Sequence, residues 1–216
     1  MNDFNNPDHL PTGIRPLAAE LIAGAAAIST ERGEALTDLA EITANQLRES
    51  GKASLTFICT HNSRRSHLSQ VTATVAAVFH DLAGIQCYSG GTEATACNPR
   101  TVAAFKRAGF EVEQTDENEN PVYTIGVATG GETLKAWSKV YNEDGNPAEG
   151  YIAVMTCTHA DENCPIAGGA SDRVSLPFTD PKESDDTPEE AITYDLRLRE
   201  IGSQMFRLMS EVKRLS

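Results

Sequence analysis

Between residues 51 and 216, short apolar runs bounded by turn-forming residues alternate with longer amphipathic segments. The apolar runs predict strands at Ser54–Ile58, Ile85–Ser89, Ile152–Thr156 and Arg173–Leu176. The amphipathic segments predict helices at Ser66–Leu82, Pro99–Ala108 and Pro188–Leu215. Because strands that alternate with helices form parallel sheets with right-handed crossovers, we expect an α/β fold with an open, doubly wound, four-stranded sheet in the order 2-1-3-4, flanked by helices.

The first 50 residues precede this alternating region and have helical periodicity. They predict two helices, Arg15–Ile28 and Thr30–Arg48, with Ser29 or Thr30 as the N-cap of the second. We therefore divide the chain into an N-terminal helical extension (1–50) and a main domain (51–216). The apolar stripe of the second helix would pack on the main domain or on a second subunit.

Residues 117–150 interrupt the alternation and predict an insert. Two segments, Pro121–Ile125 and Leu134–Tyr141, flank a glycine pair and indicate a β-hairpin. The aromatic side chains of the insert would either cover a functional site or pack as a small separate core; they are Tyr123, Trp137 and Tyr141.

The composition, with 40% hydrophobic and 23% charged residues, is typical of a soluble protein. No apolar run approaches the roughly 18 residues of a membrane span, and the N-terminus lacks a basic signal-peptide head, so we expect a cytoplasmic protein with no membrane partner. The net charge of −13 argues against nucleic acid as a partner. Five cysteines are an odd number, which argues against a disulfide framework and favours reactive thiols.

The clearest chemical motif follows the first predicted strand and leads into a predicted helix. Cys59 is placed there as a nucleophile, because backbone N–H groups of a strand-to-helix turn can surround a tetrahedral oxyanion. Arg65 would hold two oxygens of that anion, and Ser66 with the helix dipole would favour the thiolate. The alternative is a buried, inert cysteine. The candidate substrate-binding residues are Thr60, His61, Asn62, Ser63, Arg64, Arg65 and Ser66.

Within this loop, Asn62 suits a left-handed backbone conformation, and the side chains of His61 and Arg64 could instead face solvent. A proton donor is needed opposite the thiolate. Asp180 in an Asp-Pro pair follows the last predicted strand, at the same sheet edge, and is our candidate general acid; an Asp before Pro is otherwise a turn residue.

A second thiol, Cys157, directly follows the third predicted strand. The expected strand order makes this strand a neighbour of the first, so Cys157 and Cys59 can meet at one crevice. Cys164 lies seven residues further on, about 10.5 Å away if the segment is helical, so a Cys157–Cys164 disulfide would require unwinding. The alternatives are two ordinary buried thiols, or a metal site that includes His159.

The Cys59–Ser66 segment resembles the phosphate loop of low-molecular-weight protein tyrosine phosphatases and of the thioredoxin-coupled arsenate reductases that share their fold. Cys157 and Cys164, with the intervening Ala-Asp and the closing Asn-Cys-Pro, resemble the resolving cysteines of the reductases. The Asp180-Pro181 pair resembles the general-acid loop of both families.

The resemblance implies reduction of arsenate to arsenite through a Cys59–Cys157–Cys164 thiol relay, with thioredoxin as reductant and no cofactor. Lys182-Glu183-Ser184 stands where the phosphatases usually place aromatic residues, which favours a small inorganic oxyanion. The alternative function is a phosphatase for phosphotyrosine or a small phosphate ester, in which Cys157 and Cys164 protect Cys59 from oxidation. A third class is a redox sensor or binding module without catalysis.

Overall fold

The computed structural model describes residues 6–163 and 167–216. The helices are α1 (Arg15–Ala25), α2 (Thr30–Ser50), α3 (Arg65–Phe79), α4 (Pro99–Arg107), α5 (Thr158–Asn163) and α6 (Glu190–Leu215). The strands are β1 (Ala53–Cys59), β2 (Ile85–Gly91), β3 (Val112–Gln114), β4 (Tyr123–Gly126), β5 (Thr133–Ala136), β6 (Tyr151–Met155) and β7 (Ala170–Ser175). Short 3₁₀ helices η1 (Pro7–His9), η2 (Thr12–Ile14) and η3 (Pro181–Ser184) complete the chain.

The central sheet has the strand order β2-β1-β6-β7, and all its neighbouring strands are parallel. This arrangement confirms the expected open sheet in the order 2-1-3-4. Ile58 pairs with Met155, and Cys59 pairs with Gly91, so the carboxyl ends of β1, β2 and β6 meet at one edge. That edge is where open parallel sheets bind ligands.

The two central strands, β1 and β6, are buried on both faces, whereas the edge strand β7 is exposed or half-buried along its length. Side chains alternate between the two faces of a strand. On β6, Ile152 and Val154 belong to the large core, whereas Tyr151, Ala153 and Met155 belong to a smaller cluster on the other face. The smaller cluster also contains both Cys59 and Cys157. The two thiols therefore share one apolar cluster at the end of the sheet.

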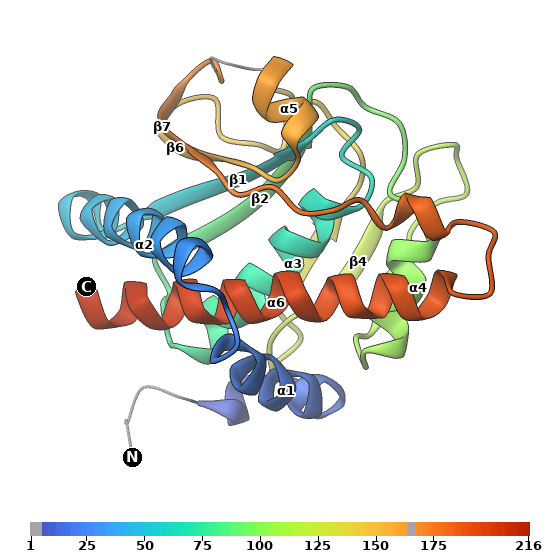
Figure 1. Cartoon of the computed structure of the whole chain (residues 1–216), viewed down its shortest axis with the longest axis horizontal. Helices are drawn as coiled ribbons and strands as arrows, with labels where there is room; N and C mark the ends of the chain where they lie inside the picture. The colour runs from blue at the N-terminus through green and yellow to red at the C-terminus, as the bar shows by residue number, and fades with distance from the viewer. Residues whose placement is uncertain (1–5, 164–166) are drawn as a thin grey trace.

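Helix α6 crosses the molecule, and α1, α2, α3 and α4 all pack along it (Figure 1). Ser29 caps α2 as expected, and Gly51 ends this helix with a left-handed φ of 72°. Leu10 and Leu36 of the first 50 residues lie in the same core as Phe57 of β1. The division into an extension and a main domain stays a prediction. Within the described residues, none of the helices has the length and apolar character that crossing a membrane requires.

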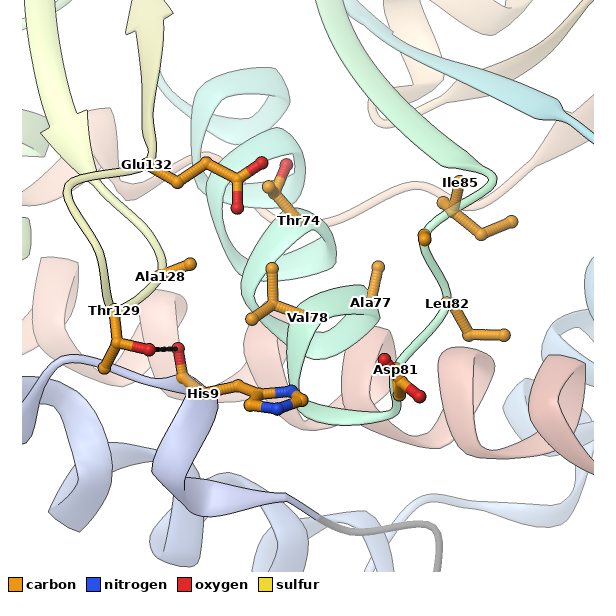
Figure 2. A pocket seen from close by; sticks show the side chains of 11 residues that line it. His9, Thr74, Ala77, Val78, Asp81, Leu82, Ile85, Ala128, Thr129 and Glu132 are labelled. Carbon is orange, nitrogen blue, oxygen red and sulfur yellow. Dashed lines mark hydrogen bonds between the residues drawn. The ribbon is translucent and has the colours of Figure 1, made fainter.

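The insert contains the expected hairpin, formed by β4 and β5. β5 ends at Ala136, short of the expected Tyr141, and the preceding β3 pairs with β4 to make a three-stranded antiparallel sheet. The hairpin turn reaches the N-terminal segment, where Thr129 N–H donates to the His9 carbonyl at 2.8 Å. A pocket of about 340 Å³ lies there, lined by His9, Thr74, Asp81, Thr129 and Glu132 among others (Figure 2). None of the predicted site residues lines it.

Candidate active site

The predicted oxyanion loop, residues 59–66, begins at the last residue of β1 and ends in the first turn of α3. Asn62 has a φ of 45°, the left-handed conformation expected for it. The loop lies directly against Gly91 at the end of β2. A Cβ atom at Gly91 would lie 2.7 Å from the Thr60 carbonyl oxygen and 2.8 Å from the Asn62 nitrogen, so only glycine lets the loop approach this closely.

Cys59 lies at the base of the loop and is 3% exposed. Its Sγ is 3.1 Å from the Ser66 hydroxyl oxygen. Asn62 Nδ2 donates to the same hydroxyl oxygen at 2.9 Å, which leaves the Ser66 proton free to point toward the sulfur. The loop thus places a hydroxyl donor against the sulfur, at the N-terminus of a 15-residue helix.

Two other loop side chains face away from the thiol. The Ser63 hydroxyl donates to the Ala96 carbonyl at 2.7 Å, and the Ser63 carbonyl accepts from Asn98 N–H at 3.0 Å. The His61 imidazole is exposed and lies 3.7 Å from the Glu93 carboxylate. The Ser63 contacts hold the loop to the segment that follows β2.

Arg65 and Asp180 are bound to each other. Arg65 Nη2 donates to Asp180 Oδ2 at 2.7 Å, and Arg65 Nη1 donates to the Phe178 carbonyl at 3.0 Å. Asp180 also accepts from Lys182 N–H through its other oxygen, at 3.1 Å. The candidate acid and the candidate anion-binding guanidinium therefore meet, as the sequence predicts for one sheet edge. An oxyanion that binds Arg65 must compete with the Asp180 carboxylate.

Arg64 is held inside the protein, so the interpretation that it faces solvent is wrong. Its Nε donates to the Tyr194 hydroxyl at 2.7 Å and its Nη2 to Asp185 Oδ2 at 2.9 Å. Burial alone would lower the pKa of Arg64, but the Tyr194 hydrogen bond and the carboxylates of Asp180 and Asp185 leave that pKa raised. Arg64 thus presents a permanent positive charge 4.0 Å from Asp180.

Cys157 follows β6 and is 1% exposed. Its Sγ lies 3.5 Å from the Thr60 hydroxyl of the oxyanion loop and accepts from Ala160 N–H at 3.3 Å. Cys157 is a free thiol, as are Cys59, Cys87 and Cys97. The structure therefore places a second thiol against the loop that carries the first. Cys164, the third predicted redox residue, lies outside the described residues.

The insert contacts the oxyanion loop through the segment 138–141. The Ser138 hydroxyl donates to the His61 carbonyl at 2.8 Å, and Lys139 N–H donates to Asn62 Oδ1 at 3.0 Å. The same segment pairs with the end of β2, where Gly91 N–H donates to the Lys139 carbonyl at 2.9 Å and Tyr141 N–H to the Gly91 carbonyl at 3.0 Å. The insert thereby fixes the left-handed Asn62.

We expect Ser138→Ala to loosen the loop. The change removes the donor to His61 and the acceptor of Thr95 N–H, which lies 2.8 Å from the Ser138 hydroxyl. Two unpaired polar groups should lower the free energy of unfolding by about 1–3 kcal/mol and weaken phosphate binding. Denaturant unfolding and competitive inhibition by phosphate measure both effects. Ser210→Ala, at an exposed position on α6, is the control and should change neither.

Two buried ionisable side chains, Lys139 of the insert and His67 of α3, have shifted pKa values near the loop. Burial lowers the pKa of Lys139 to about 8, and its ammonium lies 4.0 Å from the centre of the Trp137 ring. Burial, with a smaller contribution from the charge of Lys139, lowers the pKa of His67 to about 3, so this imidazole is neutral at physiological pH. Tyr123 packs in the large core and Trp137 against Lys139. Tyr141, by contrast, packs against the smaller cluster that contains Cys59 and Cys157, so one of the three aromatic side chains of the insert lies against the thiols and the other two pack elsewhere.

Known proteins similar to this chain include bacterial arsenate reductases. The chain is 28% identical over 158 residues to an arsenate reductase of Bacillus licheniformis, and the match covers 72% of this chain and 94% of that protein. It is 28% identical over 151 residues to an arsenate reductase of Halalkalibacterium halodurans, covering 69% of this chain and 89% of that protein. The chain is thus similar in sequence to bacterial arsenate reductases. No family model matches it.

Solved structures of more distant proteins are also similar to this chain. A low-molecular-weight protein tyrosine phosphatase from T. tengcongensis superposes with a TM-score of 0.45 at 14% identity, covering 74% of this chain and 99% of that one. A thioredoxin-dependent arsenate reductase of Corynebacterium glutamicum has a TM-score of 0.41 at 18% identity, covering 89% of this chain and 84% of that one. Both TM-scores are low, so the fold rests on the strand order given above.

Several residues of this site were missed by sequence reasoning. Ser138 and Lys139 lie in the insert, 77 residues from the loop atoms that they contact, and no local pattern connects them. Tyr194 and Asp185 hold Arg64 across 130 and 121 residues. One sequence feature could have indicated such partners. Arg64 and Arg65 are adjacent at the start of a buried helix, so their guanidinium groups require hydrogen-bond acceptors elsewhere in the chain.

Proposed function

We propose that the protein reduces arsenate to arsenite through Cys59, Cys157 and Cys164, and that thioredoxin regenerates the thiols. The observation that carries the proposal is the position of Cys157, whose sulfur lies 3.5 Å from the Thr60 hydroxyl in the loop that holds Cys59. Hydrolysis of a phosphate ester needs one nucleophilic thiol. A second thiol against the same loop suits a reaction that ends in a disulfide.

The first step is attack of the Cys59 thiolate on arsenate. The loop N–H groups at the start of α3 and the Arg65 guanidinium bind the oxyanion. As the bond between sulfur and arsenic forms, one arsenate oxygen leaves and takes a proton from Asp180. This exchange requires Arg65 to turn from Asp180 toward the anion, which frees Asp180 from its 2.7 Å ion pair at the moment when it must carry a proton.

The second step transfers two electrons to arsenic. The Cys157 thiolate attacks Cys59 Sγ, the sulfur–arsenic bond breaks, and its electron pair leaves with arsenic as arsenite. A Cys59–Cys157 disulfide remains. Cys164 then attacks Cys157, which restores the Cys59 thiolate and leaves a Cys157–Cys164 disulfide for an external dithiol to reduce. The chemistry needs no cofactor, and a reducing compartment such as the cytoplasm suits it.

We expect Asp180→Asn to slow the first step by roughly 10²–10⁴-fold, the usual contribution of a general acid. Binding of phosphate as an arsenate analogue should be unchanged or tighter, because the carboxylate that competes for Arg65 is gone. Single-turnover kinetics and phosphate inhibition separate the two effects. Asp172→Asn, at an exposed position on β7, is the matched control. A variant with normal rate and altered affinity alone would make Asp180 a turn residue.

The decisive assay measures arsenite release by the purified protein with thioredoxin, thioredoxin reductase and NADPH, and with each omitted in turn. Phosphate release from an aryl phosphate is measured beside it. We expect sustained arsenite release that depends on thioredoxin. Hydrolysis of the aryl phosphate without arsenite release would instead establish the phosphatase, and absence of both reactions would favour the redox sensor or binding module.

A further inference from the structure

The Thr60 hydroxyl connects His159 of α5 to the second thiol, Cys157. Thr60 Oγ1 is 3.5 Å from Cys157 Sγ and 3.2 Å from His159 Nδ1. The three groups come from two neighbouring strand ends, because Thr60 follows β1, and Cys157 and His159 follow β6. A hydroxyl can accept one hydrogen bond while it donates another, so this row has the connectivity of a proton relay.

The proposed thiol relay, on which this inference rests, requires the Cys157 proton to leave before attack, since the nucleophile is the thiolate. Cys157 is 1% exposed, so bulk water has little access to its proton. His159 is exposed and can exchange a proton with water. After the proton has left, Ala160 N–H still donates to the sulfur at 3.3 Å and supports the anion.

We propose that His159 accepts the Cys157 proton through the Thr60 hydroxyl and thereby activates the second nucleophile. The Cys157 proton moves to Thr60 Oγ1 while the Thr60 proton moves to His159 Nδ1, so Thr60 ends neutral, Cys157 anionic and His159 cationic. No electron moves in this step. The thiolate then attacks Cys59 Sγ as described above, and His159 returns its proton to solvent.

The other ionisable groups near α5 are less suited than His159 to accept the Cys157 proton. On the helix itself, Asp161 accepts from Arg173 of β7 at 2.5 Å and from the Ser175 hydroxyl at 2.6 Å. Glu162 is exposed on the same helix. Cys59 lies at the end of β1, and its sulfur is within hydrogen-bond distance of the Ser66 hydroxyl. Of these groups, His159 is the one in contact with the Thr60 hydroxyl.

The test uses His159→Asn, because an amide can hydrogen-bond to Thr60 but cannot take up a proton near neutral pH. In a Cys164→Ser background, one equivalent of arsenate is added, and the Cys59–Cys157 disulfide is followed by quenched mass spectrometry from pH 5.5 to 8.5. We expect His159→Asn to slow disulfide formation by roughly 10²-fold and to change its pH profile, with formation of the arsenic adduct unaffected.

Controls separate the relay from a structural effect. Glu162→Gln on the same helix should behave as the parent, and Thr60→Ser, which keeps the hydroxyl, should retain the pH profile that Thr60→Val loses. The rate of Cys157 alkylation by iodoacetamide against pH gives a readout that needs no arsenate. An unchanged alkylation profile in His159→Asn overturns the relay. If the alkylation profile depends on His159 but the protein releases no arsenite, the proposed function is overturned. The proton relay from Cys157 to His159 would then still hold.

Discussion

Replacement of Cys59 by serine should abolish arsenate reduction and any aryl phosphate hydrolysis. A serine hydroxyl has no accessible anion at neutral pH and cannot form the sulfur–arsenic bond, so the expected loss is on the scale seen when other enzymes lose a nucleophile, on the order of 10⁶-fold. Phosphate binding should survive, because the loop N–H groups and Arg65 are unchanged. Arsenite release and phosphate protection against thermal unfolding measure the two properties.

Cys87→Ser is the matched control for this experiment. Burial raises the pKa of Cys87 to about 12, so this sulfur stays protonated at neutral pH and supplies no thiolate. Its carbonyl accepts from Gln70 Nε2 at 3.2 Å, a backbone contact that the substitution keeps. The control should therefore retain full turnover. Substantial turnover by Cys59→Ser would instead remove Cys59 as the nucleophile.

The sheet order was predictable because strand and helix alternate in the sequence, and that alternation restricts the connections. The meeting of Cys59 and Cys157 at one edge follows from the same order, since the strands that precede them are neighbours. The left-handed Asn62 was predictable from residue type. These predictions depend on local patterns and on one rule of chain connection.

The remaining features depend on contacts between distant segments. β3 is three residues long and has no apolar run, so nothing in its own sequence marks it as a strand. The burial of Arg64 depends on Tyr194 and Asp185, which lie on other elements. The insert is predicted only as a hairpin with three aromatic side chains, yet its Ser138 and Lys139 contact the oxyanion loop. Tertiary contacts of this kind leave no periodic signal.

The electrostatic state of the site also arises only from the folded chain. The sequence shows an acidic protein of net charge −13. In the structure, two guanidiniums flank Asp180, with Arg65 Nη2 at 2.7 Å and Arg64 Nε at 4.0 Å. Asp185 pairs with Arg64 as well, so the two guanidiniums face two carboxylates. Arg65 can bind an oxyanion once it turns from Asp180, and the negative charges of the rest of the chain oppose this little, because charges beyond roughly 10 Å are screened at 0.1 M salt.

Serine substitutions of the two resolving cysteines should stall the reaction at different points. Cys157→Ser should stop with arsenic bound to Cys59, because no thiol remains beside the loop to break the sulfur–arsenic bond. Cys164→Ser should release one equivalent of arsenite and stop as the Cys59–Cys157 disulfide. Mass spectrometry after one equivalent of arsenate, without reductant, distinguishes these products by the mass of the intact chain and by the linked peptides.

The two variants also separate the reductase from the phosphatase. Neither Cys157 nor Cys164 takes part in hydrolysis of a phosphate ester, so any such activity should persist in both variants while arsenate turnover is lost. Steady multiple turnover by Cys157→Ser in the presence of thioredoxin would exclude the relay, since arsenite would then leave Cys59 by another route.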